Sequence, residues 1–259
     1  MAAFVAQEST PWVFFRSIIH ITLFTIATAV FLVPILLMGL LRRQRALHWF
    51  GRLWARSCVF ITGSNVEFEN LDKLYRDGPV IILCNHQSNF DVLALASAID
   101  LQLRFMAKAS LFRIPFFGWA LSGGGHIPVE RDDRRKAQAS LFAAAERIKN
   151  GTSVFVFPEG TRGNLDGTML PFKKGGFVLA KKAGVVLQPV TIWGSHRILP
   201  TDDRYKLPRV FPGTVRGIVH DPIHPEEYKQ LSLDALAEKI HGIVERPLER
   251  LSKVAAVLD

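Results

Sequence analysis

A long uncharged apolar segment near the N-terminus restricts the fold of this 259-residue chain more than any other feature. From Ser17 to Leu41, a run of 25 residues, there is no Asp, Glu, Lys or Arg, and Ile, Leu, Phe, Val and Ala dominate. At about 1.5 Å per residue such a helix is about 37 Å long, whereas the apolar part of a bilayer is about 30 Å thick. The segment therefore predicts a membrane-anchoring helix.

Basic residues flank this segment. One arginine precedes it and three follow it closely: Arg16, then Arg42, Arg43 and Arg45. Because basic residues near a span favour the cytoplasmic side, we expect the rest of the chain to face the cytoplasm, at the inner membrane in a bacterium. The formal net charge of +9 also predicts an anionic partner, although charge alone does not separate lipid, phosphorylated metabolite and nucleic acid.

The segment has three other interpretations. Ala27-Thr28-Ala29 resembles a signal-peptidase site, but the apolar run continues beyond it to Leu41. A buried helix of a soluble core is usually shorter. Insertion into one leaflet stays open, because Pro34 favours a kink and the segment 49–56 combines aromatic residues with arginines, as interfacial helices do. We assign residues 1–63 to a two-helix anchor.

After residue 63 short apolar runs alternate with amphipathic segments. We predict strands over 79–83, 104–107, 126–129, 153–157 and 185–192, and helices over 91–98, 132–149, 175–183 and from Ser232 onward. This order indicates an α/β fold for residues 64–259, with a mostly parallel sheet flanked by helices. Pro189 predicts that its strand is an edge strand or starts there.

The first chemical motif follows the strand at 79–83. His86 and Asp91 are five residues apart, in a loop and in the first turn of a helix. A carboxylate in that position can orient an imidazole, which then accepts a proton from a hydroxyl group. By spacing alone, a structural role for His86 at the helix start is the simpler interpretation.

A second motif, Pro158-Glu159-Gly160-Thr161-Arg162, follows another apolar strand. Thr161 and Arg162 can donate to oxyanions, and Gly160 allows close backbone approach. Lys173 and Lys174 precede a helix start and are typical of a phosphate site. The alternative is a solvated turn in which Glu159 pairs with Arg162.

In a third segment, Gly125 to Arg131, the Arg131 side chain either adds a second guanidinium for the same anion or forms a surface ion pair. We interpret His126 as structural.

Together and in this order, four segments resemble the conserved blocks of the glycerolipid acyltransferases, specifically the lysophosphatidate acyltransferases. They are Asn85-His86-Gln87-Ser88 through Asp91, Gly125 through Arg131, Phe157 through Arg162, and Pro189-Val190. The resemblance covers roughly residues 80–195. Gly163, Pro128 and Gln188 depart from the family pattern.

The resemblance implies a role for each matching residue. His86 is the general base and Asp91 orients it. Glu159, Gly160, Thr161 and Arg162, with Arg131, hold the phosphate and glycerol of the acceptor, and Lys108 also faces the phosphate. The acceptor is then a lysophospholipid, namely 1-acyl-glycerol-3-phosphate, and the donor is acyl-CoA or an acyl carrier protein. We expect no cofactor and no metal, and the two cysteines lack the spacing of a thiolate zinc site.

Three other functions remain. A same-fold enzyme can use another acceptor, such as glycerol-3-phosphate or a lyso amino-acid lipid. A membrane-bound thioesterase uses water in place of the alcohol. A non-catalytic basic binder keeps the fold without the chemistry; we expect no nucleic-acid partner, because the basic residues cluster at the anchor and the phosphate loops.

Overall fold

The computed structural model describes residues 11–41, 43–130, 134–164, 166–200 and 208–258. Within them one seven-stranded sheet has the order β1-β7-β6-β2-β5-β3-β4. The strands are β1 (Asn65–Glu69), β2 (Val80–Cys84), β3 (Leu103–Lys108), β4 (Ile127–Val129), β5 (Ser153–Val156), β6 (Val186–Trp193) and β7 (Thr214–Val219). Every neighbouring pair is parallel except β6 and β7. The sheet is therefore mostly parallel, as the sequence predicts.

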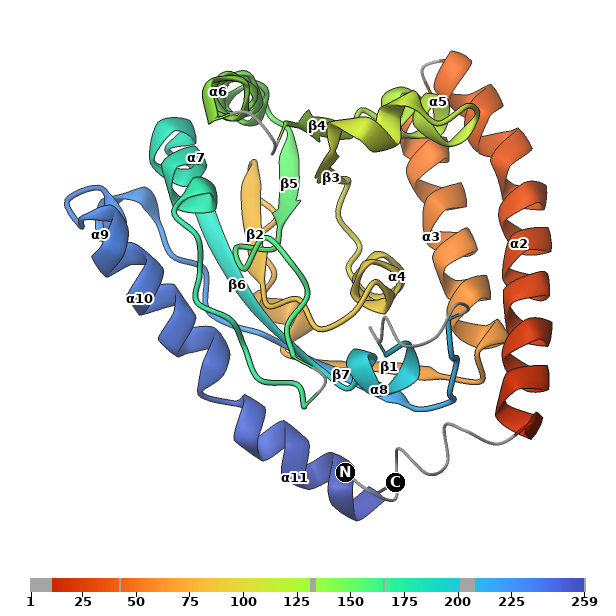
Figure 1. Cartoon of the computed structure of the whole chain (residues 1–259). Coiled ribbons are helices and arrows are strands. Elements are labelled where there is room, and N and C mark those ends of the chain that lie inside the picture. Colours follow the sequence, from red (N-terminus) through yellow and green to blue (C-terminus); the bar gives the residue numbers. More distant parts are fainter. Residues whose placement is uncertain (1–10, 42, 131–133, 165, 201–207, 259) are drawn as a thin grey trace.

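Helices cover both faces of this sheet (Figure 1). On one face Ile81 and Leu83 pack in a cluster with α6 (Arg134–Lys149), α7 (Gly175–Ala183) and α10 (Leu233–Glu245). On the other face Ile82 packs in a cluster with α3 (Gln44–Ile61) and α4 (Phe90–Ala98). Because β2 pairs on both edges and is covered on both faces, all five of its residues are buried, which explains its uninterrupted apolar sequence.

The expectation for Pro189 is wrong. Pro189 is the fourth residue of β6, which lies inside the sheet between β2 and β7. The proline is tolerated because β7 pairs with β6 only from Val190 to Trp193. At the end of this ladder the Pro189 carbonyl accepts a hydrogen bond from the His220 N–H, a bond that does not use the proline nitrogen.

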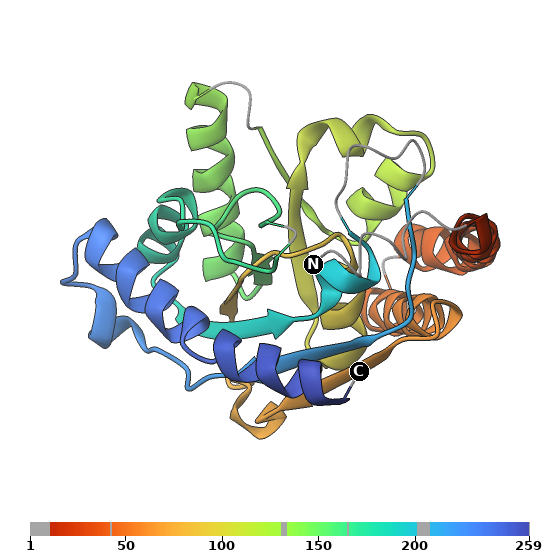
Figure 2. The same cartoon turned by 60° about the horizontal axis from the view of Figure 1, so that its bottom comes forward.

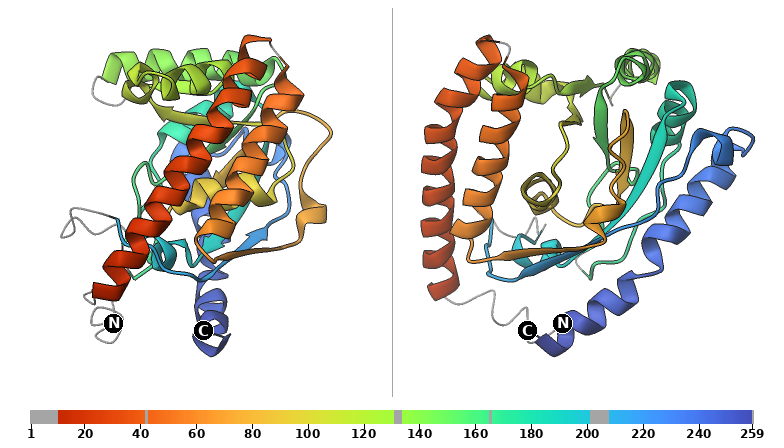
Figure 3. Two further views of the ribbon diagram at one scale, coloured as in Figure 1. Left: turned by 90° about the vertical axis from the view of Figure 1, so that its right-hand side faces the viewer. Right: turned by 180° about the vertical axis from the view of Figure 1, so that it is seen from behind.

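The N-terminal segment forms a helical hairpin against the α/β domain (Figure 3). Helix α2 (Pro11–Leu40) is continuous past Pro34 and is long and apolar enough to cross a membrane. Both of its ends contact the domain. The Ser17 hydroxyl accepts from the Val210 N–H at 3.1 Å, and a Cβ built on Gly39 would lie 3.3 Å from the Gly123 Cα.

Helix α3 belongs to the domain core as much as to the hairpin. Ala55, Cys58 and Val59 are buried in the same cluster as β2 and α4. Arg52 forms an ion pair with Asp100, and Arg56 donates to the Ser97 carbonyl. The two arginines of the predicted interfacial segment therefore bind the α/β domain.

The remaining elements are η1 (Leu71–Lys73), η2 (Ala109–Arg113), α5 (Phe117–Gly123), α8 (Ser195–Ile198), α9 (Pro225–Tyr228) and α11 (Leu248–Leu258).

Candidate active site

His86 and Asp91 meet where β2 ends and α4 begins. The His86 Nδ1 lies 2.8 Å from the Asp91 Oδ2, and Asp91 is fully buried. The same oxygen accepts the backbone N–H groups of Gln87 and Ser88 at 2.7 and 2.9 Å. The carboxylate therefore closes the loop on itself and sits in the first turn of α4, where the helix dipole favours a negative charge.

This contact fixes the orientation of the imidazole. Because the Asp91 oxygen is an acceptor, we assign the ring proton to Nδ1, and the Nε2 of a neutral His86 is left as a proton acceptor. The ring stacks on Phe157 with centroids 3.9 Å apart and planes 17° apart. The His86 side chain is 15% exposed, so it remains open to a small reactant while being held on one face.

The segment that follows β5 clamps the backbone of His86. The Glu159 Oε1 accepts the His86 N–H at 2.6 Å, and the Gly163 N–H donates to the His86 carbonyl at 2.7 Å. The loops after β2 and β5 therefore lie side by side, as Figure 2 shows. A Cβ on Gly163 would lie 2.9 Å from the Thr168 carbonyl oxygen, so this departure from the family pattern has a steric reason.

Glu159 is buried beneath this turn. Its second oxygen accepts the Leu170 N–H at 2.8 Å, so both carboxylate oxygens serve backbone donors. Burial raises the pKa of Glu159, and the two backbone hydrogen bonds oppose that rise. The alternative pairing with Arg162 does not occur among the described residues. In this structure Glu159 supports His86 rather than facing outward, and its predicted contact with the acceptor stays a prediction.

Cationic side chains lie around the same turn. Arg162 is half-buried, and its guanidinium makes no hydrogen bond or ion pair with another described residue. Gly160 has a φ of +70°, and a Cβ built there would lie 3.1 Å from the Lys173 Nζ, so the Lys173 side chain covers this glycine. Thr161 is exposed. Lys174 instead forms an ion pair with Asp234 at 2.7 Å.

The other predicted acceptor residues come from neighbouring strands. Lys108 is the exposed last residue of β3, which is parallel to β5, so the two strands end at the same edge of the sheet. Arg131 lies outside the described residues. The structure thus brings His86, Asp91, Glu159, Gly160 and the turn to Arg162 together, with Lys173 over the turn, as a site at strand ends requires.

Sequence reasoning missed the polar side chains that hold the loop after β2. Asn85 pairs with the backbone of Ile192 through two hydrogen bonds of 2.9 and 2.8 Å. Gln87 donates to the Gly167 carbonyl and accepts from the Gly194 N–H and the His196 Nδ1. Asn85 and Gln87 belong to the first motif, and this position in the sequence could have indicated their role. No local sequence pattern indicates the role of His196.

Two further residues have structural environments. The Ser88 hydroxyl donates to the Leu199 carbonyl at 2.7 Å, so it holds the loop after β2. Burial lowers the pKa of His126 to about 4, and its Nδ1 accepts the Phe105 N–H at 2.9 Å.

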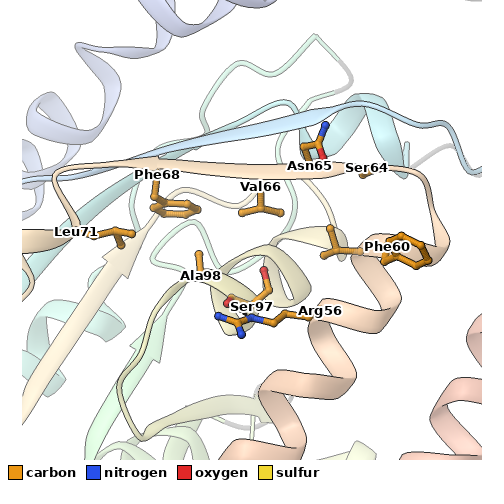
Figure 4. Close-up of a pocket in the computed structure, with 10 residues that line it drawn as sticks. Arg56, Phe60, Ser64, Asn65, Val66, Phe68, Leu71, Ser97 and Ala98 are labelled. Carbon is orange, nitrogen blue, oxygen red and sulfur yellow. Dashed lines mark hydrogen bonds between the residues drawn. The ribbon is translucent and has the colours of Figure 1, made fainter.

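A separate depression of about 370 Å³ lies between α3, β1 and α4 (Figure 4). It is lined by Arg56, Phe60 and Ser97 among others, and by none of the predicted site residues.

Comparison with known proteins identifies the family. The acyltransferase family model matches residues 65–193. The chain is 38% identical over 183 residues to a chloroplastic 1-acyl-sn-glycerol-3-phosphate acyltransferase of Arabidopsis thaliana, covering 70% of this chain and 50% of that protein. It is 32% identical over 210 residues to the 1-acyl-sn-glycerol-3-phosphate acyltransferase of Haemophilus influenzae, covering 81% of this chain and 82% of that protein.

A solved structure is also similar. The crystal structure of the 1-acyl-sn-glycerophosphate (LPA) acyltransferase PlsC from Thermotoga maritima superposes with a TM-score of 0.80 and 26% identity, covering 93% of this chain and 98% of that one. This chain spans about half the length of the chloroplastic relatives, at 50% and 52%. The matches agree with the resemblance seen in the sequence motifs, and the chain belongs to the 1-acyl-sn-glycerol-3-phosphate acyltransferase family.

Proposed function

We propose that this chain transfers a fatty acyl group from acyl-CoA or an acyl carrier protein to the sn-2 hydroxyl of 1-acyl-glycerol-3-phosphate, giving phosphatidic acid. The observation that carries the proposal is the 2.8 Å contact between the His86 Nδ1 and a fully buried Asp91. This contact leaves one imidazole nitrogen as a base, and no covalent enzyme intermediate is needed. The names of the relatives support the choice of acceptor.

The reaction proceeds through proton transfer at the His86 Nε2. This nitrogen takes the proton of the acceptor hydroxyl while the hydroxyl oxygen attacks the thioester carbonyl. The Asp91 carboxylate stabilises the imidazolium that forms. The imidazolium then protonates the departing sulfur, so the products are the new ester and a free thiol. General base catalysis of this kind contributes a factor of about 10² to 10⁴ in rate.

The acceptor phosphate binds to the cationic turn after β5. Arg162 has no partner among the described residues, and its planar guanidinium matches two phosphate oxygens. Lys173, Thr161 and Lys108 add donors, and Arg131 is part of the same proposal from the sequence. Glu159 holds the base in place through the His86 N–H. The glycerol hydroxyl then lies between the phosphate site and the imidazole.

We further propose that α2 lies within one leaflet, with the domain on the cytoplasmic face. Both ends of α2 contact the α/β domain, at Val210 and at Gly123. A helix crossing the bilayer upright would carry these contacts, and the domain with them, into the apolar interior. A helix inserted along the surface keeps both contacts and brings the site to the lipid acceptor.

A substrate panel tests the function. The purified chain in phosphatidylcholine vesicles is offered 1-acyl-glycerol-3-phosphate, glycerol-3-phosphate, a lyso amino-acid lipid or no acceptor, each with acyl-CoA and with acyl carrier protein. Thiol release and ester formation are measured together. We expect thiol release to require 1-acyl-glycerol-3-phosphate. Equal release without any acceptor would identify a thioesterase, and preference for another acceptor would replace the proposed substrate.

A further inference from the structure

A group of exposed apolar side chains projects from η2, from α5 and from the short link between them. Five of them form what we call the η2–α5 patch: Leu111, Ile114, Phe116, Phe117 and Trp119. Their exposed fractions run from 36% for Leu111 to 60% for Trp119. The Phe116 and Trp119 rings contact each other edge to face, with centroids 5.1 Å apart. Contiguous exposed aromatics of this kind mark an interaction surface.

The backbone beneath the patch is strained in a way that turns Phe116 outward. Phe116 has a φ of +62° and a ψ of −53°, and the Phe117 N–H donates to the Pro115 carbonyl at 2.7 Å. This is a γ-turn of the rare, strained hand, in which a bulky residue is disfavoured. Gly118 permits the turn, because a Cβ there would lie 2.1 Å from the Phe112 carbonyl oxygen. Burial of the Phe116 side chain does not offset this backbone strain, because the residue is 55% exposed.

The patch is continuous with the anchor hairpin. Helix α5 lies against the α2–α3 end of the molecule that contains Leu40 and Gln44 (Figures 1 and 3). Gly39 and Gly123 allow the backbones of α2 and α5 to touch, and the Gln44 amide donates to the Gly123 carbonyl at 3.3 Å. Any bilayer that surrounds this end of α2 therefore also reaches α5.

The charge around the patch fits an anionic lipid surface. No Asp or Glu occurs from Leu101 to Val129, whereas Arg104, Lys108 and Arg113 lie in that segment. Lys108 is exposed and directly precedes η2. The Arg113 side chain is 81% exposed, and its guanidinium lies 4.0 Å from the carboxylate of Glu130, the acidic residue that follows this segment; such an exposed pair contributes under about 1 kcal/mol. Aromatic side chains beside exposed basic residues are the usual composition of a surface that binds at the level of lipid headgroups.

We propose that the η2–α5 patch is a second bilayer contact, which inserts its aromatic side chains into the leaflet that holds α2. The inference rests on the proposed function only in taking the chain to work at a membrane. It places Lys108, and with it the predicted phosphate site, at headgroup depth. A lysolipid can then present its hydroxyl to His86 while its acyl chain stays in the leaflet.

Lipid quenching of a site-specific label tests this contact. The native thiols are buried and unreactive, since burial raises the pKa of Cys58 to about 12 and that of Cys84 well above its ordinary value. An environment-sensitive fluorophore is attached at Phe117→Cys, at Val33→Cys on α2 and at Ala235→Cys on α10, in chains reconstituted into phosphatidylcholine and phosphatidylglycerol vesicles. Quenchers carried on the lipids and iodide in the water report the depth.

We expect the label at position 117 to be quenched by the lipid probe as strongly as the label at 33, and at least fivefold more strongly than the label at 235. Iodide quenching of position 117 equal to that of 235 would overturn the proposal. Protection that depends on protein concentration in detergent without lipid would instead indicate a second copy and overturn it as well. This readout does not require acyl transfer, so it succeeds or fails independently of the proposed function.

A second variant separates lipid contact from folding. Trp119→Ser should lower turnover of lysolipid presented in vesicles about tenfold and leave turnover of detergent-dispersed lysolipid within about twofold. Leu71→Ser, which replaces a similarly exposed apolar residue on η1, is the matched control and should change neither. Equal loss in both assays for Trp119→Ser would assign the residue to folding and contradict a bilayer contact.

Discussion

The loops that follow β2 and β5 meet at one edge of the sheet, but they differ in how far their polar side chains are buried and hydrogen-bonded. After β2, Asn85, Gln87, Ser88 and Asp91 are all buried and hydrogen-bonded within the protein. After β5 only Glu159 turns inward, while Thr161 and Lys173 are exposed and Arg162 is half-buried. Protein groups hold the side chains of the first loop, except for the buried Asp91 Oδ1, which has no hydrogen-bond partner among the described residues. In the second loop the Thr161, Arg162 and Lys173 side chains make no hydrogen bond with another described residue.

This difference separates two requirements of acyl transfer. A base must be held in one orientation before the reactants arrive, because reorganisation during the reaction costs rate. A substrate site must leave donors for the ligand. Substitutions in the first loop should therefore lower kcat, whereas substitutions in the second should raise KM.

The largest effect is expected for His86→Ala. Loss of the base should lower kcat by a factor of about 10² to 10⁴, because no other described group replaces the imidazole beside Asp91. Phosphatidic acid formation by the reconstituted chain measures it, and the unfolding temperature and vesicle binding serve as controls. More than about a tenth of the activity in a folded, membrane-bound variant would contradict the assignment of His86.

Acid should weaken the β2 loop through His196. Burial lowers the pKa of His196 to about 4 from 6.5, so the unfolded chain takes up a proton that the folded chain does not between these values. The free energy of unfolding should therefore fall as pH decreases through that window, by about 1 kcal/mol per pH unit from this residue. Urea unfolding at about pH 7 and about pH 5 measures the slope.

The matched control for acid sensitivity is His196→Gln, which keeps a donor for Gln87 but does not titrate. Its unfolding free energy should depend less on pH than that of the unchanged chain. The remaining dependence includes His126, whose pKa burial also lowers to about 4. An identical slope in both proteins would show that His196 does not contribute.

Arg162→Ala should raise the KM for 1-acyl-glycerol-3-phosphate by about 10- to 100-fold, the range expected for one charge-assisted hydrogen bond. The unfolding temperature should stay unchanged, because the guanidinium has no partner among the described residues to lose. Initial rates over a range of lysolipid concentrations measure this effect. An unaltered KM would remove Arg162 from the phosphate site.

Glu159→Gln tests whether Glu159 acts on kcat, like the residues of the β2 loop, or on KM, like the other residues of the β5 loop. Glutamine offers only one oxygen, so either the His86 N–H or the Leu170 N–H faces an amide NH₂ group, at a cost of about 1 to 3 kcal/mol. We expect kcat to fall about tenfold with KM nearly constant. A raised KM with constant kcat would instead support the direct contact with the acceptor that the family resemblance implies.

The smallest expected effect is a difference in KM between substitutions of two adjacent lysines. Lys173 covers Gly160, whereas Lys174 pairs with Asp234 on the surface. Lys173→Ala should raise the KM severalfold, and Lys174→Ala should change KM and stability little, because an exposed ion pair contributes under about 1 kcal/mol. Equal effects of the two substitutions would argue against a specific role for Lys173.

Much of this architecture follows from local sequence. Alternating apolar runs predicted β2, β3, β5 and β6 and helices α4 and α7 within a residue or two, because these patterns reflect burial of each element by itself. The His86–Asp91 contact was also predictable, since five residues across a helix start bring the two side chains within reach. No expectation covered β1 and β7. Strand β7 runs antiparallel to β6 and β1 pairs in parallel with β7, so both strands depend on pairing between residues far apart along the chain.

The sequence by itself determined a long apolar N-terminal helix, a mostly parallel α/β domain and a histidine with an aspartate in reach, because these depend on periodicity and short spacing. Only the tertiary structure decided that Glu159 and Gly163 hold the backbone of His86 and that Gln87 reaches His196. These partners are 73 to 109 residues apart along the chain. The hydrogen bonds between them exist because parallel strands bring their C-terminal ends, and the loops that follow, to one edge of the sheet.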